Sequence, residues 1–220
     1  MNMISSRIRH ARFKHLHLLA ITVAALAVFG ANASAQKASD IPASFQLHST
    51  AFSRGGALPL SAIFNNPVNG VNTCTANGAA GGDQSPQLSW TNAPWGTRSF
   101  VVVLYDVTAS FTHWGMYNIA GSATGLPENA GIAGSSYGQQ ILNDFEVGNE
   151  YDGPCPPANV APDSHAYVFT VYALSDRLDL PGSANFPANA ETLFHALIAA
   201  GREGKILGSA SLNGFYSSTP

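Results

Sequence analysis

The stretch SFVVVLYDVTASFTHWGMYNI, residues 99–119, decides how this chain folds. Its residues 100–105 form an unbroken apolar run of β-branched and aromatic side chains, which is typical of a strand buried on both faces. The run ends in the carboxylate of Asp106, and His113 opens a second run of strand composition over residues 114–119. If the two strands pair antiparallel, the end of the first lies beside the start of the second. We therefore expect Asp106 and His113 to lie together at one rim of a sheet.

Other segments of strand composition surround this pair. The strongest is AYVFTVYAL, residues 166–174, with His165 at its start. Further strands are expected near the ends of the chain and before the central pair, at residues 45–49, 58–60, 85–90 and 206–216. Strands at this spacing, separated by glycine-rich and proline-rich connections, predict a mostly β protein, an antiparallel β-sandwich with long loops.

One helix is expected, late in the chain. Asn189 can cap its N-terminus, and Gly201 can end it. Between them, an apolar stripe at helical spacing predicts the side that packs on the sandwich; its members are Leu193, Phe194, Leu197 and Ile198.

The first 35 residues have the pattern of a secretory signal peptide. A basic segment precedes an uncharged apolar core at residues 18–29, and Ala33-Ser34-Ala35 offers the small residues that signal peptidase reads. The core is shorter than the ~20 residues of a membrane-spanning helix. A retained membrane anchor is the alternative. We predict a signal peptide at 1–35, a single domain at 36–220 without a membrane span, and a periplasmic or secreted location.

Removal of that segment makes the chain strongly acidic. All 13 acidic residues but only six of the ten basic ones lie beyond Ala35, so the net charge changes from −3 to −7. The six basic residues are scattered along the chain and form no basic cluster. An acidic domain of this kind lacks the basic patch that nucleic acids require, and nucleic-acid binding is excluded.

Two cysteines, Cys74 and Cys155, remain in the mature chain. An even number in an oxidising compartment favours a single disulfide, and two free buried thiols are the alternative. Cys74 lies in a long loop at residues 65–83, and loops of that length are usually functional or tied down. Two cysteines are too few for a structural zinc site.

Three polar residues at strand ends form the candidate site: Asp106, His113 and His165. They can share a site, or each can mark only the point where burial stops. Two histidines and a carboxylate are also the ligand set of non-haem iron or catalytic zinc, although the mature chain has no closely spaced histidine pair. A second motif, Gly134-Ser135-Ser136-Tyr137-Gly138, fits the G-x-S-x-G of hydrolases. That motif needs a strand before it and a helix after it, whereas the sequence around this one predicts a loop.

Several motifs give the chain a family resemblance. SPQLSW at 85–90, followed by PWGTRS at 94–99, resembles the S-P-x-L-x-W and P-x-G-T-x-S segments of the phosphatidylethanolamine-binding protein family, and specifically its bacterial Raf-kinase-inhibitor-like branch. HW…NI at 113–119, LPE at 126–128 and GPCPP…HAY at 153–167 continue the pattern in the same order. The matches run from about residue 45 to residue 216.

The resemblance implies a β-sandwich whose C-terminal helix lies next to a small pocket that binds anions, notably the phosphate of phospholipid head groups. Matched by motif, the ligand-binding residues are Asp106, His113, Pro157, His165 and Tyr167. The family's D-P-D-A is replaced by DVTA at 106–109, which lacks the Pro and the second Asp. The resemblance also places Cys74 and Cys155 beside the pocket, within bridging distance.

The pocket chemistry is that of an anion site. Two imidazoles and a Tyr hydroxyl supply hydrogen-bond donors, while Asp106 fixes an imidazole tautomer and favours its protonation. The resemblance thus implies that the chain binds a small anionic or phospholipid-like ligand without a cofactor and modulates an unidentified protein partner. No activated nucleophile is visible, which favours a binding protein over an enzyme. The rival interpretation is a metal-dependent oxygenase or hydrolase that uses Asp106, His113 and His165.

Export gives the first testable prediction. The protein recovered from outside the cytoplasm should begin at Gln36, because cleavage follows Ala35 in the small-residue motif. N-terminal sequencing checks this start. Recovery of the intact chain in the membrane fraction would contradict it.

Overall fold

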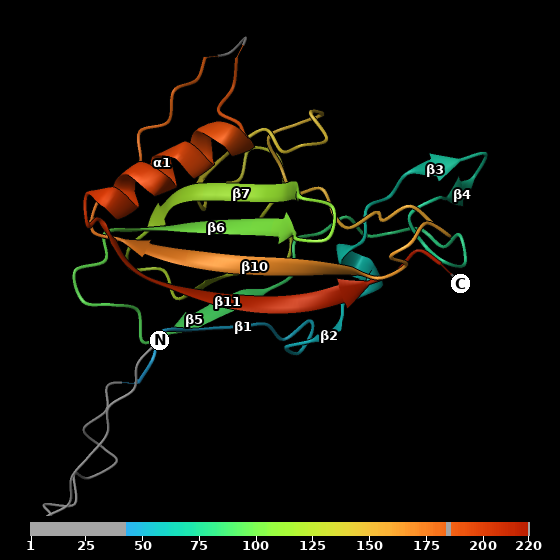
Figure 1. Cartoon of the computed structure of the whole chain (residues 1–220), viewed down its shortest axis with the longest axis horizontal. Coiled ribbons are helices and arrows are strands. Elements are labelled where there is room, and N and C mark those ends of the chain that lie inside the picture. The colour runs from blue at the N-terminus through green and yellow to red at the C-terminus, as the bar shows by residue number, and fades with distance from the viewer. Residues whose placement is uncertain (1–42, 184–185, 220) are drawn as a thin grey trace, which may run out of the picture. The chain divides into compact units, whose positions relative to one another are not determined.

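The computed structural model of this chain describes residues 43–183 and 186–219 (Figure 1). The predicted signal peptide at 1–35 lies outside the described residues, and the boundaries 1–35 and 36–220 stay predictions. Within the described part of the chain, no helix combines the length and apolarity that crossing a membrane requires.

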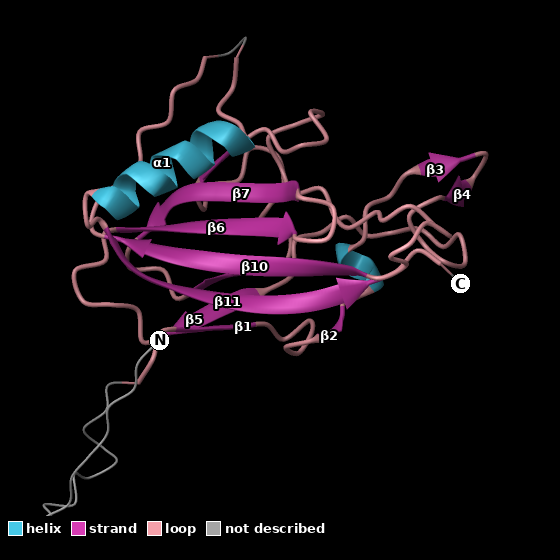
Figure 2. Cartoon of the chain, in the orientation of Figure 1, coloured by secondary structure: helices cyan, strands magenta, loops and turns pink. Residues whose placement is uncertain are grey.

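A six-stranded sheet is the main element of the fold (Figure 2). Its four long central strands are antiparallel neighbours in the order β11-β10-β6-β7, as the two apolar runs of the sequence predict. β6 is buried along nearly its whole length, as expected for a strand covered on both faces. The strands of this sheet, in spatial order, are β2 (Gly56–Ala57), β11 (Ile206–Tyr216), β10 (His165–Leu174), β6 (Ser99–Asp106), β7 (Phe111–Ala120) and β9 (Gln139–Gln140).

A second sheet of three short strands packs on one face of the first and makes the sandwich. It consists of β1 (Gln46–His48), β5 (Leu88–Thr91) and β8 (Gly125–Leu126). The apolar core between the two sheets contains Trp90 of the small sheet and Phe100 of the large one, whose rings lie 5.0 Å apart. The predicted mostly β sandwich is confirmed.

One predicted strand is wrong. Residues 58–60 were expected to form an edge strand, but the strand β2 ends at Ala57 and a 3-10 helix, η2 (Leu60–Ala62), follows. Pro59 is the N-cap of this helix, a place where its missing N–H costs nothing.

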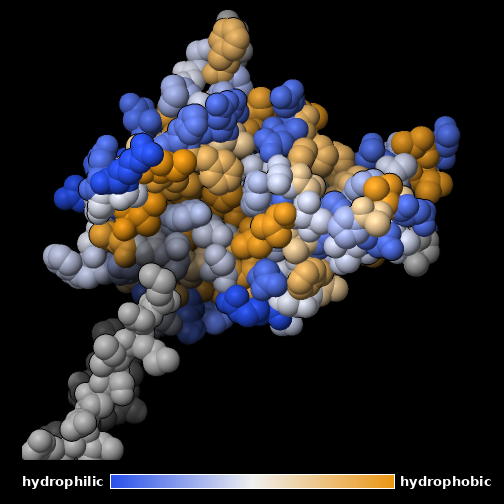
Figure 3. Space-filling model, in the orientation of Figure 1, coloured by the Kyte–Doolittle hydropathy of each residue, from blue (hydrophilic) through white to orange (hydrophobic). Residues whose placement is uncertain are grey.

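A two-stranded hairpin of β3 (Pro67–Val68) and β4 (Val71–Asn72) extends from the loop that contains Cys74. Figure 3 shows apolar side chains on its surface at the right of the view, and Val68 and Val71 are both exposed. The hairpin therefore adds little to the core of the sandwich.

The single α-helix, α1 (Ala190–Arg202), covers the other face of the large sheet. Its N-terminal cap is confirmed: Asn189 Oδ1 accepts from the Thr192 N–H, and Thr192 Oγ1 accepts from the Asn189 N–H. The predicted end is corrected, because Gly201 lies inside the helix and Gly204 takes the left-handed conformation, with φ +69°.

The apolar side of the helix is narrower than the sequence indicated. Leu193 and Leu197 are buried against β6 and β7, whereas Ile198 is exposed. The sheet is thus covered on both faces, by the small sheet on one side and by the helix on the other.

The two cysteines form a disulfide, Cys74–Cys155, which closes a loop with a sequence separation of 81 residues. The Cys74 carbonyl also accepts hydrogen bonds from the hydroxyls of Tyr216 and Ser218. These two hydrogen bonds connect the long loop to the C-terminal strand. The predicted disulfide between Cys74 and Cys155 is confirmed.

Removing the disulfide should destabilise the domain. Replacing both cysteines with serine should lower the free energy of unfolding by about 4 kcal/mol, because the unfolded chain is freed from a closed loop of this size. Denaturant titration measures the change, and dithiothreitol should destabilise the wild type but not the double variant. Two titratable thiols in unfolded, non-reduced protein would contradict the prediction.

Candidate functional site

The end of the large sheet nearest the β3–β4 hairpin brings the predicted site residues together (right-hand side of Figure 1). β6 ends there at Asp106, while β7 and β10 begin there. Asp106 pairs with Phe111 across one strand boundary and with Tyr167 across the other. Directly paired residues point to the same face, so these side chains all lie on the inner side of the sandwich, and His165, two residues before Tyr167, joins them.

A β-bulge sets the position of His113. Leu104 pairs with Trp114, but the next residue of β6, Tyr105, pairs with Thr112, which leaves His113 as the additional residue of β7. The bulge lets two consecutive side chains, His113 and Trp114, be buried on the same side of the strand. The imidazole of His113 consequently lies 5.4 Å from the Tyr167 ring, measured between centroids.

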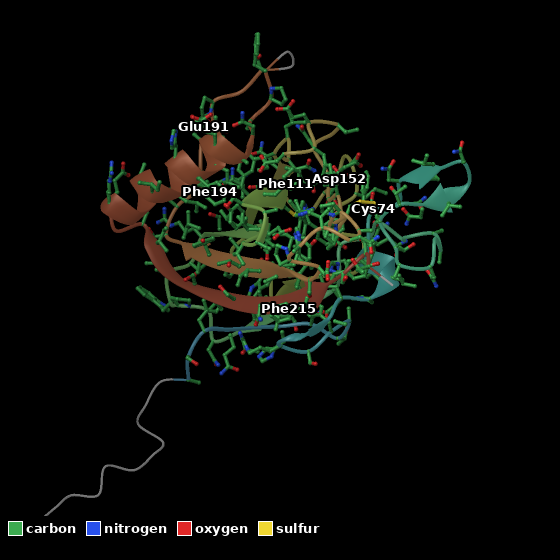
Figure 4. The ribbon with its side chains drawn as sticks, turned by 45° about the vertical axis from the view of Figure 1, so that its right-hand side comes forward. Cys74, Phe111, Asp152, Glu191, Phe194 and Phe215 are labelled. Atoms are coloured by element: carbon green, nitrogen blue, oxygen red, sulfur yellow. A yellow bond between two sulfur atoms is a disulfide. The ribbon has the colours of Figure 1, made fainter. Side chains whose placement is uncertain are left out.

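These side chains line a cavity of about 180 Å³. All five residues predicted to bind ligand, Asp106, His113, Pro157, His165 and Tyr167, are in its lining. No residue of α1 lines it, so the helix lies across the sheet from the cavity and not beside it, because the apolar side of the helix packs on the opposite face. In Figure 4, Phe194 lies on the helix, and Phe111, Asp152 and Cys74 follow to its right, in the direction of the β3–β4 hairpin. The rest of the lining consists of Ala109, Phe111, Phe145, Cys155 and Pro156.

The aromatic part of the cavity was missed at the sequence level. Phe111 lies 4.9 Å from His113 and 4.8 Å from Phe145, between ring centroids. Phe111 stands at the start of β7, and its alternation with His113 could have indicated it. Phe145 lies in a loop without periodicity, so no local signal marks it.

Asp106 connects the turn after β6 to the start of β10. Its Oδ1 accepts from the backbone N–H groups of Thr108 and Ala109, at 2.8 and 3.0 Å. Its Oδ2 lies 2.6 Å from His165 Nδ1. A carboxylate only accepts, so His165 carries its hydrogen on Nδ1. The carboxylate is thus fully engaged within the protein and orients the imidazole of His165.

The DVTA segment builds this turn without the family's Pro and second Asp. Thr108 Oγ1 accepts a hydrogen bond from the Ala166 N–H at 2.9 Å, and the Val107 N–H donates to the Ala166 carbonyl. Thr108 thus fastens the turn to β10 with its hydroxyl. The carboxylate that binds His165 is the retained one, Asp106.

His113 is held by the backbone of the loop before Cys155. Its Nδ1 lies 3.0 Å from the Asp152 carbonyl oxygen, which can only accept, so Nδ1 carries the hydrogen. Burial lowers the pKa of His113 to about 4, although the carbonyl groups of Asp152 and Gly153 and the charges of Asp106 and Asp144 favour the protonated form. Neutral pH therefore leaves His113 uncharged.

Tyr167 presents a hydroxyl to the cavity without a hydrogen bond. The residue is 0% exposed, and this hydroxyl is the one buried side-chain N or O atom of the described residues that lacks a partner. Burial raises the pKa of Tyr167 well above its usual value, and the nearby carboxylate of Asp106 raises it further. The hydroxyl therefore stays protonated and can donate a hydrogen bond to a ligand.

The enzyme motifs weighed at the sequence level find less support in the geometry. Among residues 43–183 and 186–219, no group of three or more His, Cys, Asp or Glu side chains is arranged to hold a metal ion. The segment around Ser136 is a series of turns and bends that leads into the two-residue strand β9, so it lacks the strand-turn-helix of a hydrolase nucleophile.

Comparison with known proteins agrees with the motifs. A family model described as phosphatidylethanolamine-binding protein matches residues 48–217. A UPF0098 protein of Aquifex aeolicus is 36% identical over 181 residues, covering 75% of this chain and 92% of its own. The UPF0098 protein YbcL of Escherichia coli is 33% identical over 165 residues, covering 71% and 78%.

Solved structures have the same fold. The crystal structure of Escherichia coli YbcL, described as a new member of the mammalian PEBP family, matches with a TM-score of 0.64 and 29% identity, over 80% of this chain and 99% of that chain. A homologue of phosphatidylethanolamine-binding protein from Chlamydia trachomatis matches with a TM-score of 0.58 and 27% identity, over 79% and 97%. The chain therefore belongs to the phosphatidylethanolamine-binding protein family.

Proposed function

We propose that this chain is an exported binding protein whose cavity holds a small oxyanion such as the phosphate of a head group. The observation that carries the proposal is the buried Tyr167 hydroxyl, which lines the cavity and has no protein partner among the described residues. An unsatisfied buried hydroxyl costs about 1–3 kcal/mol. A ligand oxygen in the cavity would supply the missing acceptor.

The size of the cavity limits what it can enclose. At about 180 Å³ it is smaller than the ~300–1,000 Å³ of sites for drug-sized molecules. It has room for a phosphate-sized group but not for the acyl chains of a lipid, so a phospholipid would enter by its head group alone.

Export is supported by the disulfide, since such bonds persist in oxidising compartments. A periplasmic or secreted location is thus part of the proposal, and modulation of a protein partner remains an expectation from the family resemblance.

An enzymatic role is the second candidate, favoured by the contact between Asp106 and His165. A carboxylate that orients an imidazole through Nδ1 leaves Nε2 free to act as a base. Among the described residues that line the cavity, however, none is a serine, a threonine or a free cysteine. We therefore propose binding and not catalysis, and release of product from phosphate esters by the purified protein would overturn that choice.

The protonation of His113 is directly measurable. Its ring should titrate with a midpoint at about pH 4, and its neutral form should carry hydrogen on Nδ1, because burial opposes the charge and the Asp152 carbonyl accepts that hydrogen. Nitrogen-15 NMR of the histidine rings measures both, with the unfolded protein as a control that titrates near 6.5. A folded-state midpoint at or above 6.5 would contradict the described environment.

The same shift couples to stability. Between about pH 6.5 and pH 4 the unfolded chain binds a proton at His113 that the folded chain does not. Above about pH 6.5 the ring is neutral in both states and does not affect the free energy of unfolding. As the pH falls from about 6.5 to 4, protonation of the unfolded chain lowers the free energy of unfolding, by about 3 kcal/mol at most.

Removing the Tyr167 hydroxyl tests the binding proposal. Tyr167→Phe should weaken the binding of phosphate or phosphoethanolamine about tenfold, equivalent to roughly 1.4 kcal/mol, because one donor is lost. Stability should stay unchanged or rise, since the hydroxyl has no partner in the unliganded protein. Isothermal titration calorimetry measures the affinity and denaturant titration the stability.

The matched control is Tyr172→Phe. Tyr172 lies on the same strand but packs with the cluster on the helix side of the sheet, so its substitution should leave affinity unchanged. Equal affinities for wild type and Tyr167→Phe would remove the support for this cavity.

A further inference from the structure

We propose that Asp83 is a positioning residue of the site, acting on His113 through the peptide group that joins Asp152 to Gly153. In this arrangement the charge of Asp83 sets how firmly the His113 ring is held in the cavity. Asp83 ends the long loop that contains Cys74 and does not line the cavity itself. The effect on binding rests on the proposed function, whereas the coupling of Asp83 to His113 can be tested without a ligand.

Two side chains bind opposite ends of a single peptide group. Asp83 Oδ1 accepts from the Gly153 N–H at 2.7 Å, and His113 Nδ1 donates to the Asp152 carbonyl oxygen at 3.0 Å. The Asp152 carbonyl and the Gly153 N–H belong to the same peptide unit, whose resonance couples them. Carboxylate, peptide and imidazole thus form one continuous chain of hydrogen bonds.

A charged acceptor at one end of this chain strengthens the bond at the other end. A carboxylate that accepts from the peptide N–H increases the negative charge on the peptide oxygen, because hydrogen bonds in series polarise one another. The Asp152 carbonyl is then a better acceptor for the His113 Nδ1 hydrogen. The 2.7 Å separation at Asp83 is short for an N–H···O bond, as expected for an ionised acceptor.

The backbone holds this chain in place on both sides. Asp83 takes the left-handed conformation, with φ +49°, and its N–H donates to the Ile63 carbonyl at 2.9 Å. Gly153 packs so tightly that a Cβ there would lie 2.1 Å from a backbone oxygen of the η2 turn. On the other side, the Asp152 N–H donates to the His113 carbonyl at 3.3 Å. Rotation of the peptide away from either partner would break these contacts, so a change at Asp83 is transmitted to the ring.

The charge of Asp83 changes within reach of neutral pH. Burial raises its pKa to about 6, although the Gly153 N–H lowers it, and the charges of Asp152 and Glu150 add to the rise. Tyr151 of the same loop is close enough to interact with this charge, and burial keeps the pKa of its hydroxyl well above the usual value. The carboxyl of Asp83 is therefore the group on this side of the peptide that changes charge near pH 6.

His113 keeps its own charge constant over the same range. Its pKa is about 4, so the ring stays neutral while Asp83 titrates. Among the described residues, the other titratable groups around the ring are Asp106 of β6, Asp144 of the loop after β9, and His165 and Tyr167 of β10. A response of the His113 Nδ1 hydrogen that follows Asp83 and disappears when Asp83 loses its charge is thus a signature of the chain of hydrogen bonds.

The ligand-free protein gives the direct test. Proton NMR follows the Gly153 amide hydrogen and the His113 Nδ1 hydrogen between pH 5 and pH 8. Both resonances should move downfield together as the pH rises, with a shared midpoint near 6, because bonds to a charged acceptor are stronger. A His113 hydrogen that stays constant while the Gly153 amide titrates would overturn the proposal, and this comparison needs no variant.

Asp83→Asn removes the charge but keeps an oxygen that can accept from Gly153. Both resonances should then stay near their low-pH positions throughout the titration. A shared response that persists in this variant would assign the titration to another group and contradict the role of Asp83.

Asp144→Asn is the matched control. Asp144 Oδ2 also accepts from a backbone N–H, that of Thr112 at 2.7 Å, and its charge acts on His113 without passing through the 152–153 peptide. This variant should retain the shared titration of the two hydrogens. Loss of the response in both variants would indicate a general effect of charge and would also overturn the proposal.

Inorganic phosphate tests the consequence for binding. Isothermal titration calorimetry at about pH 7.5 should give an affinity about threefold lower for Asp83→Asn than for Asp144→Asn, because both variants lose one negative charge and only the first loosens His113. Equal affinities would overturn the role of Asp83 in binding, even where the NMR response is present. Absence of phosphate binding to the wild type would overturn the proposed function, and the NMR titration would still decide whether Asp83 acts on His113.

Discussion

The carboxylate of Asp106 is the contact on which the end of the sandwich depends. It is 2% exposed and makes three hydrogen bonds, two to the backbone of the turn after β6 and one to His165 at the start of β10. The Asp106 carboxylate thus fixes the turn that leads into β7, and it orients the imidazole of His165 on β10, the other neighbour of β6. Replacing Asp106 would leave two N–H groups and a buried imidazole without an acceptor. The resulting loss of stability would exceed the contribution of any one of its hydrogen bonds.

The opposite wall of the cavity depends on the loop before the disulfide. Gly153 approaches the backbone so closely that a Cβ there would lie 2.1 Å from the Ala62 carbonyl oxygen, and only glycine fits. Its N–H donates to Asp83, and Tyr151 donates its hydroxyl to the same Ala62 carbonyl. The disulfide at Cys155 then fixes the next residues, so the Asp152 carbonyl that orients His113 belongs to a segment held on both sides.

Sequence reasoning worked where a pattern has a local cause. The apolar runs on either side of Asp106 and His113 dictate buried antiparallel strands, and strand ends that meet at one rim place the polar residues together. The cap at Asn189 likewise follows from adjacent residues. The predicted edge strand at 58–60 was wrong because the composition of these residues suits either an edge strand or a 3-10 turn, and tertiary packing selects the turn.

The chemistry of the cavity was less accessible to the sequence because it depends on burial and on backbone atoms. Motifs could name His113 but not the Asp152 carbonyl beside it, and that carbonyl with the loss of solvent decides the tautomer and the charge of the ring. Phe145 reaches the site from an irregular loop, so no periodic signal identifies it.

The apolar lining gives the few polar groups their influence. In a site walled by Phe111, Phe145 and two prolines, a hydrogen bond is electrostatically stronger than in water, and an unpaired polar atom is correspondingly costly. With no lysine or arginine in the described lining, it is the arrangement of donors and acceptors, and not net charge, that would distinguish one anion from another.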